Sequence, residues 1–211
     1  MGLLIKKIQQ QVNGVYITKE CNQDTIKEKY SGPQITNFYG YCLAATGKWL
    51  VDPEDTEQKI TKTSFQTVTM NLQYKFEASG VPGDIFLKNE YPEKLGNPIT
   101  KDIYKLTPEK LFNEIIYKDA TPLTLGYMMI IVGQQPGSHE PSHALGVRIE
   151  GGKYKFFDAN EGFCEMYDRD TFWQFINLYV TEPKNQEINF QGGLRGQEFT
   201  HFRVVLYNHQ P

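Results

Sequence analysis

A change in hydrophobic periodicity near residue 120 is the feature that most constrains the fold of this chain. Before it, apolar residues recur at spacings of three and four, as in residues 42–50 (CLAATGKWL) and residues 60–78, which predicts helices. After it, apolar residues form short runs such as Leu123 to Val132, which predicts a strand buried on both faces. Helices followed by an antiparallel sheet define an α+β fold. We expect one domain over residues 1–211, helical to about residue 120 and sheet-forming beyond it.

Turn and capping residues divide the chain into further elements. The stretch 80–96 is rich in Gly and Pro and predicts a long loop, whereas Thr107-Pro108-Glu109 has the residues that begin a helix. The pair Gly151-Gly152 predicts a hairpin between two strands. The remaining expected elements are strands at 144–149, 154–158, 163–167 and 202–207 and a helix that follows Asp168 and carries Phe172, Phe175, Ile176 and Tyr179.

This hairpin brings a histidine and a carboxylate close together. His143 stands at the entry of its first strand and Asp158 at the end of its second. A two-residue turn at Gly151-Gly152 places the two almost opposite each other, within side-chain reach. A carboxylate in that position can orient an imidazole that acts as a base. A coincidental surface pair is the alternative.

Cys42 is a candidate nucleophile because it follows a loop-like stretch and opens a helix with an apolar face. The positive end of a helix dipole lowers the pKa of a thiol and favours the thiolate. The alternative is a buried structural cysteine, the role expected for Cys21 and Cys164. Three cysteines without a CxxC pair predict neither a disulfide framework nor a zinc site.

A second motif imitates a metal site. His139-Glu140-Pro141-Ser142-His143 matches the HExxH pattern of zinc peptidases, in which one helical face presents both histidines. Pro141 disfavours a helix there, and a strand pattern follows. We therefore expect no metal and no cofactor.

Charge and hydropathy narrow the possible partners. A net charge of −3 and a pI near 5.8 provide no basic surplus for nucleic acid. No apolar run is long enough for a signal peptide or a membrane helix. Gly2 is the residue that myristoylation modifies, but Lys6 stands where that motif has Ser or Thr, so lipidation is not expected.

Two segments of the chain resemble the YopT-type effector cysteine proteases, a papain-like family. The first runs from about Gln34 to Leu50 and includes NFYGYCLAATGKWL; the second runs from about Pro141 to Tyr179 and includes SHAL and FFDANEGF. Ala159 stands where the family usually has Pro, whereas Asn160 and Gly162 follow the family pattern. Residues 51–140 carry no motif of the family.

This resemblance implies a papain-like fold with Cys42 as nucleophile, His143 as base and Asp158 as the residue that orients the base. It also implies an oxyanion donor upstream of the cysteine, for which Asn37 is the candidate and Gln34 the fallback. The implied activity is cleavage of a host protein by a bacterial virulence effector. Such an effector would be secreted without a cleaved signal peptide, delivered into the host cytosol and active as a monomer.

Two other functions stay open at this point. A glutamine deamidase or transglutaminase would use the same three residues, because the chemistry does not distinguish a peptide bond from a side-chain amide. A catalytically inactive fold that only binds a partner is the third possibility.

Overall fold

A computed structural model describes residues 3–21, 41–104, 125–133, 143–181 and 201–207 of the chain. Within these ranges seven strands form one antiparallel sheet in the order β1-β6-β5-β4-β3-β7-β2. The strands are β1 (Tyr16–Glu20), β2 (Pro98–Tyr104), β3 (Leu125–Gly133), β4 (His143–Glu150), β5 (Lys153–Asp158), β6 (Gly162–Met166) and β7 (His201–Tyr207).

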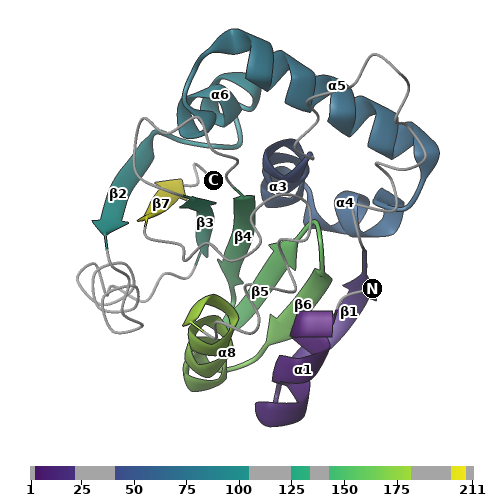
Figure 1. The fold of residues 1–211 in the computed structure, drawn as a ribbon, viewed down its shortest axis with the longest axis vertical. Helices are drawn as coiled ribbons and strands as arrows, with labels where there is room; N and C mark the ends of the chain where they lie inside the picture. The colour runs from purple at the N-terminus through teal and green to yellow at the C-terminus, as the bar shows by residue number, and fades with distance from the viewer. Residues whose placement is uncertain (1–2, 22–40, 105–124, 134–142, 182–200, 208–211) are drawn as a thin grey trace.

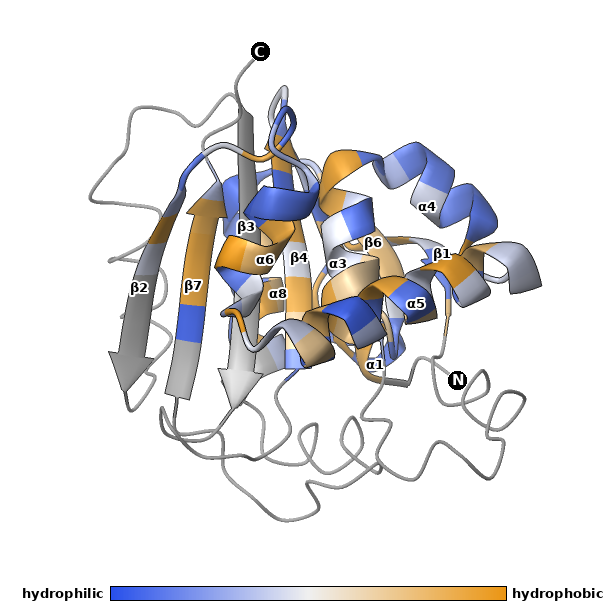
Figure 2. Cartoon of the chain, turned by 90° about the horizontal axis from the view of Figure 1, so that it is seen from above, coloured by the Kyte–Doolittle hydropathy of each residue, from blue (hydrophilic) through white to orange (hydrophobic). Residues whose placement is uncertain are grey.

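Helices cover both faces of this sheet (Figure 1). The helices α1 and α8 lie on one face, and α3 to α6 lie on the other. Their bounds are α1 (Leu3–Gln11), α3 (Cys42–Val51), α4 (Pro53–Lys59), α5 (Thr63–Ser79), α6 (Gly83–Glu90) and α8 (Arg169–Thr181). Figure 2 shows α4 as mostly hydrophilic, in keeping with its place at the outside of the helical layer. None of the described helices is long and apolar enough to cross a bilayer. The expected α+β class is confirmed.

Alternating side chains of the central strands build two separate cores. Phe156 packs with α1 and α8, whereas its neighbour Phe157 packs with α3. Leu145 and Ala144 divide between the two faces in the same way. This follows from the two-residue period of a strand, and it explains why the apolar runs of the sequence are nearly continuous.

Most predicted elements of the sheet half are present. The hairpin turns at Gly151-Gly152, where both residues have positive φ (55° and 81°). Asp168 caps α8 by accepting a hydrogen bond of 2.7 Å from the backbone N–H of Thr171. The expected helix after Thr107 lies outside the described residues. The edge strands β1 and β2 come from the first 120 residues, where only helices and loops were expected.

The predicted loop over residues 80–96 is wrong in its first half, because α6 occupies Gly83–Glu90. Pro82 immediately precedes the helix, a position in which its fixed φ favours helix entry rather than opposing it. Phe86 and Leu87 are buried and hold α6 against the rest of the helical layer. Burial of this face outweighs the Gly and Pro content on which the loop prediction relied.

The apolar residues that predict a helix over residues 60–78 do not all face the core. Val68 of α5 is 55% exposed, whereas Gln66 and Gln73 are buried. Gln66 donates to the carbonyl of Ile60 at 3.1 Å, so its burial is compensated by a hydrogen bond. The period of the helix was predicted, but not which of its faces contacts the neighbouring elements.

Candidate active site

Three elements end or begin at the predicted catalytic residues. Cys42 is the first residue of α3, His143 is the first residue of β4, and Asp158 is the last residue of β5. All three side chains are buried. The Nε2 atom of His143 lies 2.8 Å from Oδ1 of Asp158. Direct pairing of Leu145 with Asp158 explains this contact, because His143 is two residues from Leu145 and shares its side of the sheet.

Helix α3 is fixed to the strand that begins with His143. Thr46, one turn after Cys42, donates a hydrogen bond of 3.2 Å to the carbonyl of Ala144. The Trp49 ring, two turns after Cys42, lies directly over Gly146, where a Cβ atom would come within 2.7 Å of the ring. The glycine therefore permits an approach between helix and strand that any larger residue would prevent. These two contacts fix the distance from the thiol to the imidazole.

The first turn of α3 is capped from another helix. Its N-cap residue Tyr41 makes no side-chain capping bond. Instead, Oε1 of Gln73 in α5 accepts a hydrogen bond of 3.1 Å from the backbone N–H of Ala44. The side-chain amide of Gln73 donates in turn to Oε1 of Glu77 at 3.1 Å. A buried glutamine thus satisfies one of the N–H groups that a helix cannot pair internally.

Asp158 accepts hydrogen bonds on both of its carboxylate oxygens. Besides His143, the backbone N–H of Asn160 donates to Oδ1 at 2.7 Å, and the hydroxyl of Tyr179 in α8 donates to Oδ2. The thiol of Cys21 lies 3.6 Å from the backbone carbonyl oxygen of Asp158, in hydrogen-bonding contact. The sequence pattern predicts Tyr179 only as part of the apolar stripe of α8. The sequence contains one indication of the contact with Asp158, because Tyr179 carries a polar hydroxyl on a stripe that otherwise includes phenylalanines.

The electrostatics of the three residues favour separated charges. Burial opposes ionisation of the Cys42 thiol, but the charge of His143 and a hydrogen bond from it lower the pKa of Cys42 below its ordinary value. Burial also opposes the imidazolium, but the charge of Asp158 and that of Cys42 hold the pKa of His143 well above its usual range. Burial would raise the pKa of Asp158, yet His143, Tyr179 and Asn160 together lower it. The arrangement therefore favours a thiolate, an imidazolium and a carboxylate.

The other two cysteines are different in character. Burial is the main cause that raises the pKa of both Cys21 and Cys164, and neighbouring carboxylates add to the effect. Both thiols are buried and reduced. They remain neutral, and neutral thiols are poor nucleophiles.

One buried carboxylate near the site was not foreseen. Burial, followed by the charge of Asp158, raises the pKa of Glu161 to about 7. Its Oε2 accepts hydrogen bonds from the backbone N–H groups of Leu4 (3.0 Å) and Ile5 (3.3 Å) at the start of α1. Glu161 thus ties α1 to the turn that follows Asp158. Glu161 lies in the FFDANEGF segment that resembles the YopT-type proteases, but nothing in the sequence indicated its contact with residues more than 150 positions away.

Two predicted site residues and two residues of the rejected zinc pattern lie outside the described part of the chain. These are the oxyanion candidate Asn37, its fallback Gln34, and His139 and Glu140 of the HExxH pattern. The second histidine of that pattern, His143, begins a strand and bonds Asp158. Among the described residues there is no group of three or more His, Cys, Asp or Glu side chains that could hold a metal ion.

Comparison with known proteins identifies similar folds only. No protein-family model and no curated protein sequence matches the chain. The fold is similar to the crystal structure of the Pseudomonas avirulence protein AvrPphB, with a TM-score of 0.53 and 11% identity, over 80% of this chain and 91% of that one. It is also similar to PatoxP, a cysteine protease-like domain of the Photorhabdus asymbiotica toxin PaTox, with a TM-score of 0.43 and 14% identity, over 95% of this chain and 56% of that one.

Since the second TM-score is lower, only the similarity to AvrPphB bears on the fold. That similarity confirms the expected papain-like arrangement and, at the level of the fold, the resemblance to the YopT-type proteases. At 11% identity it carries no information on activity, which has to be argued from the residues of the site.

Proposed function

We propose that this chain is a papain-like cysteine peptidase that acts as a bacterial virulence effector on a host protein. One observation carries the proposal. A cysteine at a helix N-terminus contacts a histidine whose other ring nitrogen is held by a buried carboxylate. A merely structural cysteine has no need of a polarised histidine, as Cys21 and Cys164 illustrate.

The roles follow from the chemistry of each group. Cys42 is the nucleophile and attacks the carbonyl carbon of the substrate amide. Because Nε2 of His143 is engaged by Asp158, Nδ1 is the ring nitrogen that faces the thiolate and then protonates the leaving amine. Asp158 fixes the tautomer and the orientation of the imidazole. His143 then takes a proton from a water molecule, which attacks the thioester and releases the acyl group from the sulfur of Cys42.

The negative charge on the tetrahedral oxygen needs donors near the start of α3. The backbone N–H of Cys42, the first residue of α3, is proposed as one of these donors. Asn37 is proposed as the second donor, with Gln34 as the fallback. Replacement of Asn37 by Ala should lower kcat by about 10²-fold or more and leave alkylation of Cys42 unchanged.

Alkylation of the three cysteines tests the nucleophile within one molecule. Cys42 is 6% exposed and Cys21 is 7% exposed, so the two residues are almost equally buried, whereas the pKa of Cys42 is lowered and that of Cys21 is raised. We expect iodoacetamide at pH 6 to modify Cys42 well before Cys21 and Cys164, as measured by peptide mass spectrometry. The variant His143→Ala should remove that preference. Equal rates for Cys42 and Cys21 in the native protein would overturn the proposal.

Incubation with host-cell extract tests the reaction itself. The native protein should produce new N-termini in a protein target, and Cys42→Ala should produce none while still retaining that target on a column. The deamidase or transglutaminase alternative predicts an intact target with a modified glutamine, visible as a gain of about one dalton on deamidation. Cleavage by Cys42→Ala would rule out the cysteine mechanism.

The similarity to an avirulence protein supports the proposed biological setting. We propose that the chain acts as a monomer, needs no metal or cofactor, and reaches the host cytosol. Activity that persists in the presence of a strong chelator would agree with a mechanism that needs no metal.

A further inference from the structure

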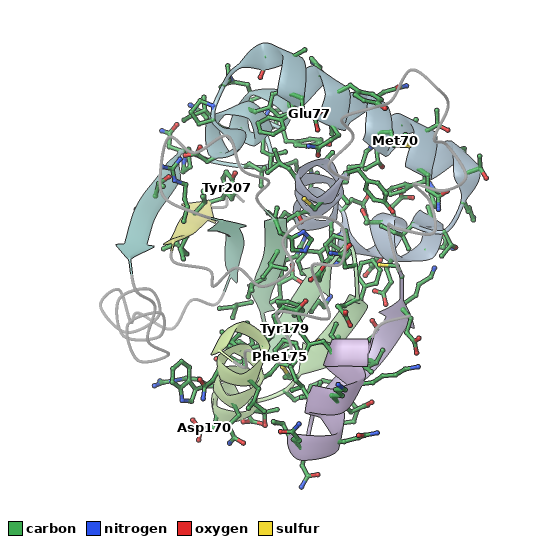
Figure 3. The ribbon with its side chains drawn as sticks, in the orientation of Figure 1. Met70, Glu77, Asp170, Phe175, Tyr179 and Tyr207 are labelled. Carbon is green, nitrogen blue, oxygen red and sulfur yellow. The ribbon has the colours of Figure 1, made fainter. Side chains whose placement is uncertain are left out.

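The hydroxyl of Tyr179 reaches the candidate site from the opposite side of the molecule to Cys42. Tyr179 belongs to α8, which covers one face of the sheet, whereas Cys42 belongs to α3 on the other face. Figure 3 shows Tyr179 beside Phe175 on α8. Its side chain is 6% exposed, and its hydroxyl donates a hydrogen bond to Oδ2 of Asp158. A tyrosine whose hydroxyl donates to a buried carboxylate of the site has a more specific position than packing requires.

The three donors around Asp158 divide between its two oxygens. His143 Nε2 and the backbone N–H of Asn160 bind Oδ1, and Tyr179 binds Oδ2. Asp158 is only 1% exposed, so without the Tyr179 hydroxyl its Oδ2 would lose this hydrogen bond while it stays buried. The carboxylate could then rotate about its bond to the chain. Such rotation would move the atom that holds the imidazole.

The ring of Tyr179 is itself held firmly in place. Its centroid lies 4.7 Å from that of Phe156 on β5 and 5.6 Å from that of Phe175 on α8. Burial, followed by the negative charge of Asp158, raises the pKa of Tyr179 well above its usual range. The hydroxyl therefore keeps its proton and remains a donor at neutral pH.

We propose that Tyr179 is a positioning residue that locks the Asp158 carboxylate and, through it, the direction of the His143 imidazole toward Cys42. This inference rests on the proposed function, because it assigns Tyr179 a part in preparing the nucleophile. Tyr179 acts through Asp158 and is therefore not assigned as a catalytic residue. Its effect would appear in how readily Cys42 ionises.

The variant Tyr179→Phe removes only the hydroxyl, and Tyr207→Phe is its matched control. Tyr207 is also buried, and it donates a hydrogen bond of 3.3 Å to the backbone carbonyl of Asp84 rather than to Asp158. The readout is the rate of Cys42 alkylation as a function of pH, which needs no knowledge of the substrate. Loss of the locked pair should move the acid limb of that profile upward by about one pH unit, which means about a tenfold lower rate at any pH on that limb.

The comparison separates a positioning role from a structural one. Tyr207→Phe should lower the melting temperature and leave the pH profile in place. If Tyr179→Phe does the same, or if its profile moves to lower pH, the positioning role is wrong. This failure differs from failure of the proposed function, in which the native Cys42 would react no faster than Cys21. Should Tyr179→Phe not fold, 3-fluorotyrosine can be incorporated at position 179, where it keeps the hydroxyl donor but lowers the pKa of that hydroxyl. If both the stability of the protein and the pH profile of Cys42 alkylation then stay unchanged, the inference is overturned.

Discussion

Ionisation of Glu161 should destabilise the folded protein at neutral pH. The pKa of this carboxyl rises from 4.5 to about 7 on folding, because burial and then the charge of Asp158 disfavour the carboxylate. Between these two values the folded state binds more protons than the unfolded state, so stability falls as pH rises. At about 1.36 kcal/mol per pH unit, the full effect above pH 7 is about 3 kcal/mol. Since Glu161 is only 4% exposed, solvent screens little of it.

The variant Glu161→Gln isolates this effect. Glutamine mimics the protonated acid and can still accept the hydrogen bonds of Leu4 and Ile5 at the start of α1. We expect the variant and the native protein to be about equally stable near pH 4. The difference should then grow through pH 4.5 to 7, until the variant is more stable by about 3 kcal/mol at pH 8. Urea unfolding at a series of pH values measures the difference directly.

The control for this experiment is an exposed carboxyl. Glu93 is exposed, and Glu93→Gln should change stability by less than about 0.5 kcal/mol at any of these pH values. A difference between Glu161→Gln and the native protein that stays flat with pH, or that declines, would refute the reasoning. It would mean that Glu161 is already stabilised as a carboxylate by the N-terminus of α1.

Three further substitutions probe the frame of the site, each measured by urea unfolding. Gly146→Ala places a Cβ atom 2.7 Å from the Trp49 ring and should cost about 1–3 kcal/mol, with a loss of Cys42 reactivity as α3 is displaced; no change would mean that the helix is not seated as described. Gln73→Leu leaves the Ala44 N–H without its acceptor and should cost about 1–3 kcal/mol; a neutral result would argue against the capping bond. Gly80→Ala meets open space but retains a φ of 64°, so it should cost only about 1–2 kcal/mol without any effect on reactivity.

Local sequence patterns were sufficient to predict several elements of this protein. Strand alternation, the Gly151-Gly152 turn and the cap at Asp168 depend on neighbours within a few residues, and these elements formed as predicted. The contact of His143 with Asp158 belongs to the same class, because a two-residue turn fixes the register of the strands it joins.

Contacts at the site between groups that are distant in the sequence could not be predicted from local patterns. Gln73 caps the helix of the cysteine from 29 residues away, Tyr179 donates to Asp158 across 21, and Glu161 binds the start of α1 across more than 150. No periodicity encodes such pairs, since each depends on how whole elements pack. The same reason explains the failure at α6, where burial of Phe86 and Leu87 against other elements outweighed a loop-like composition.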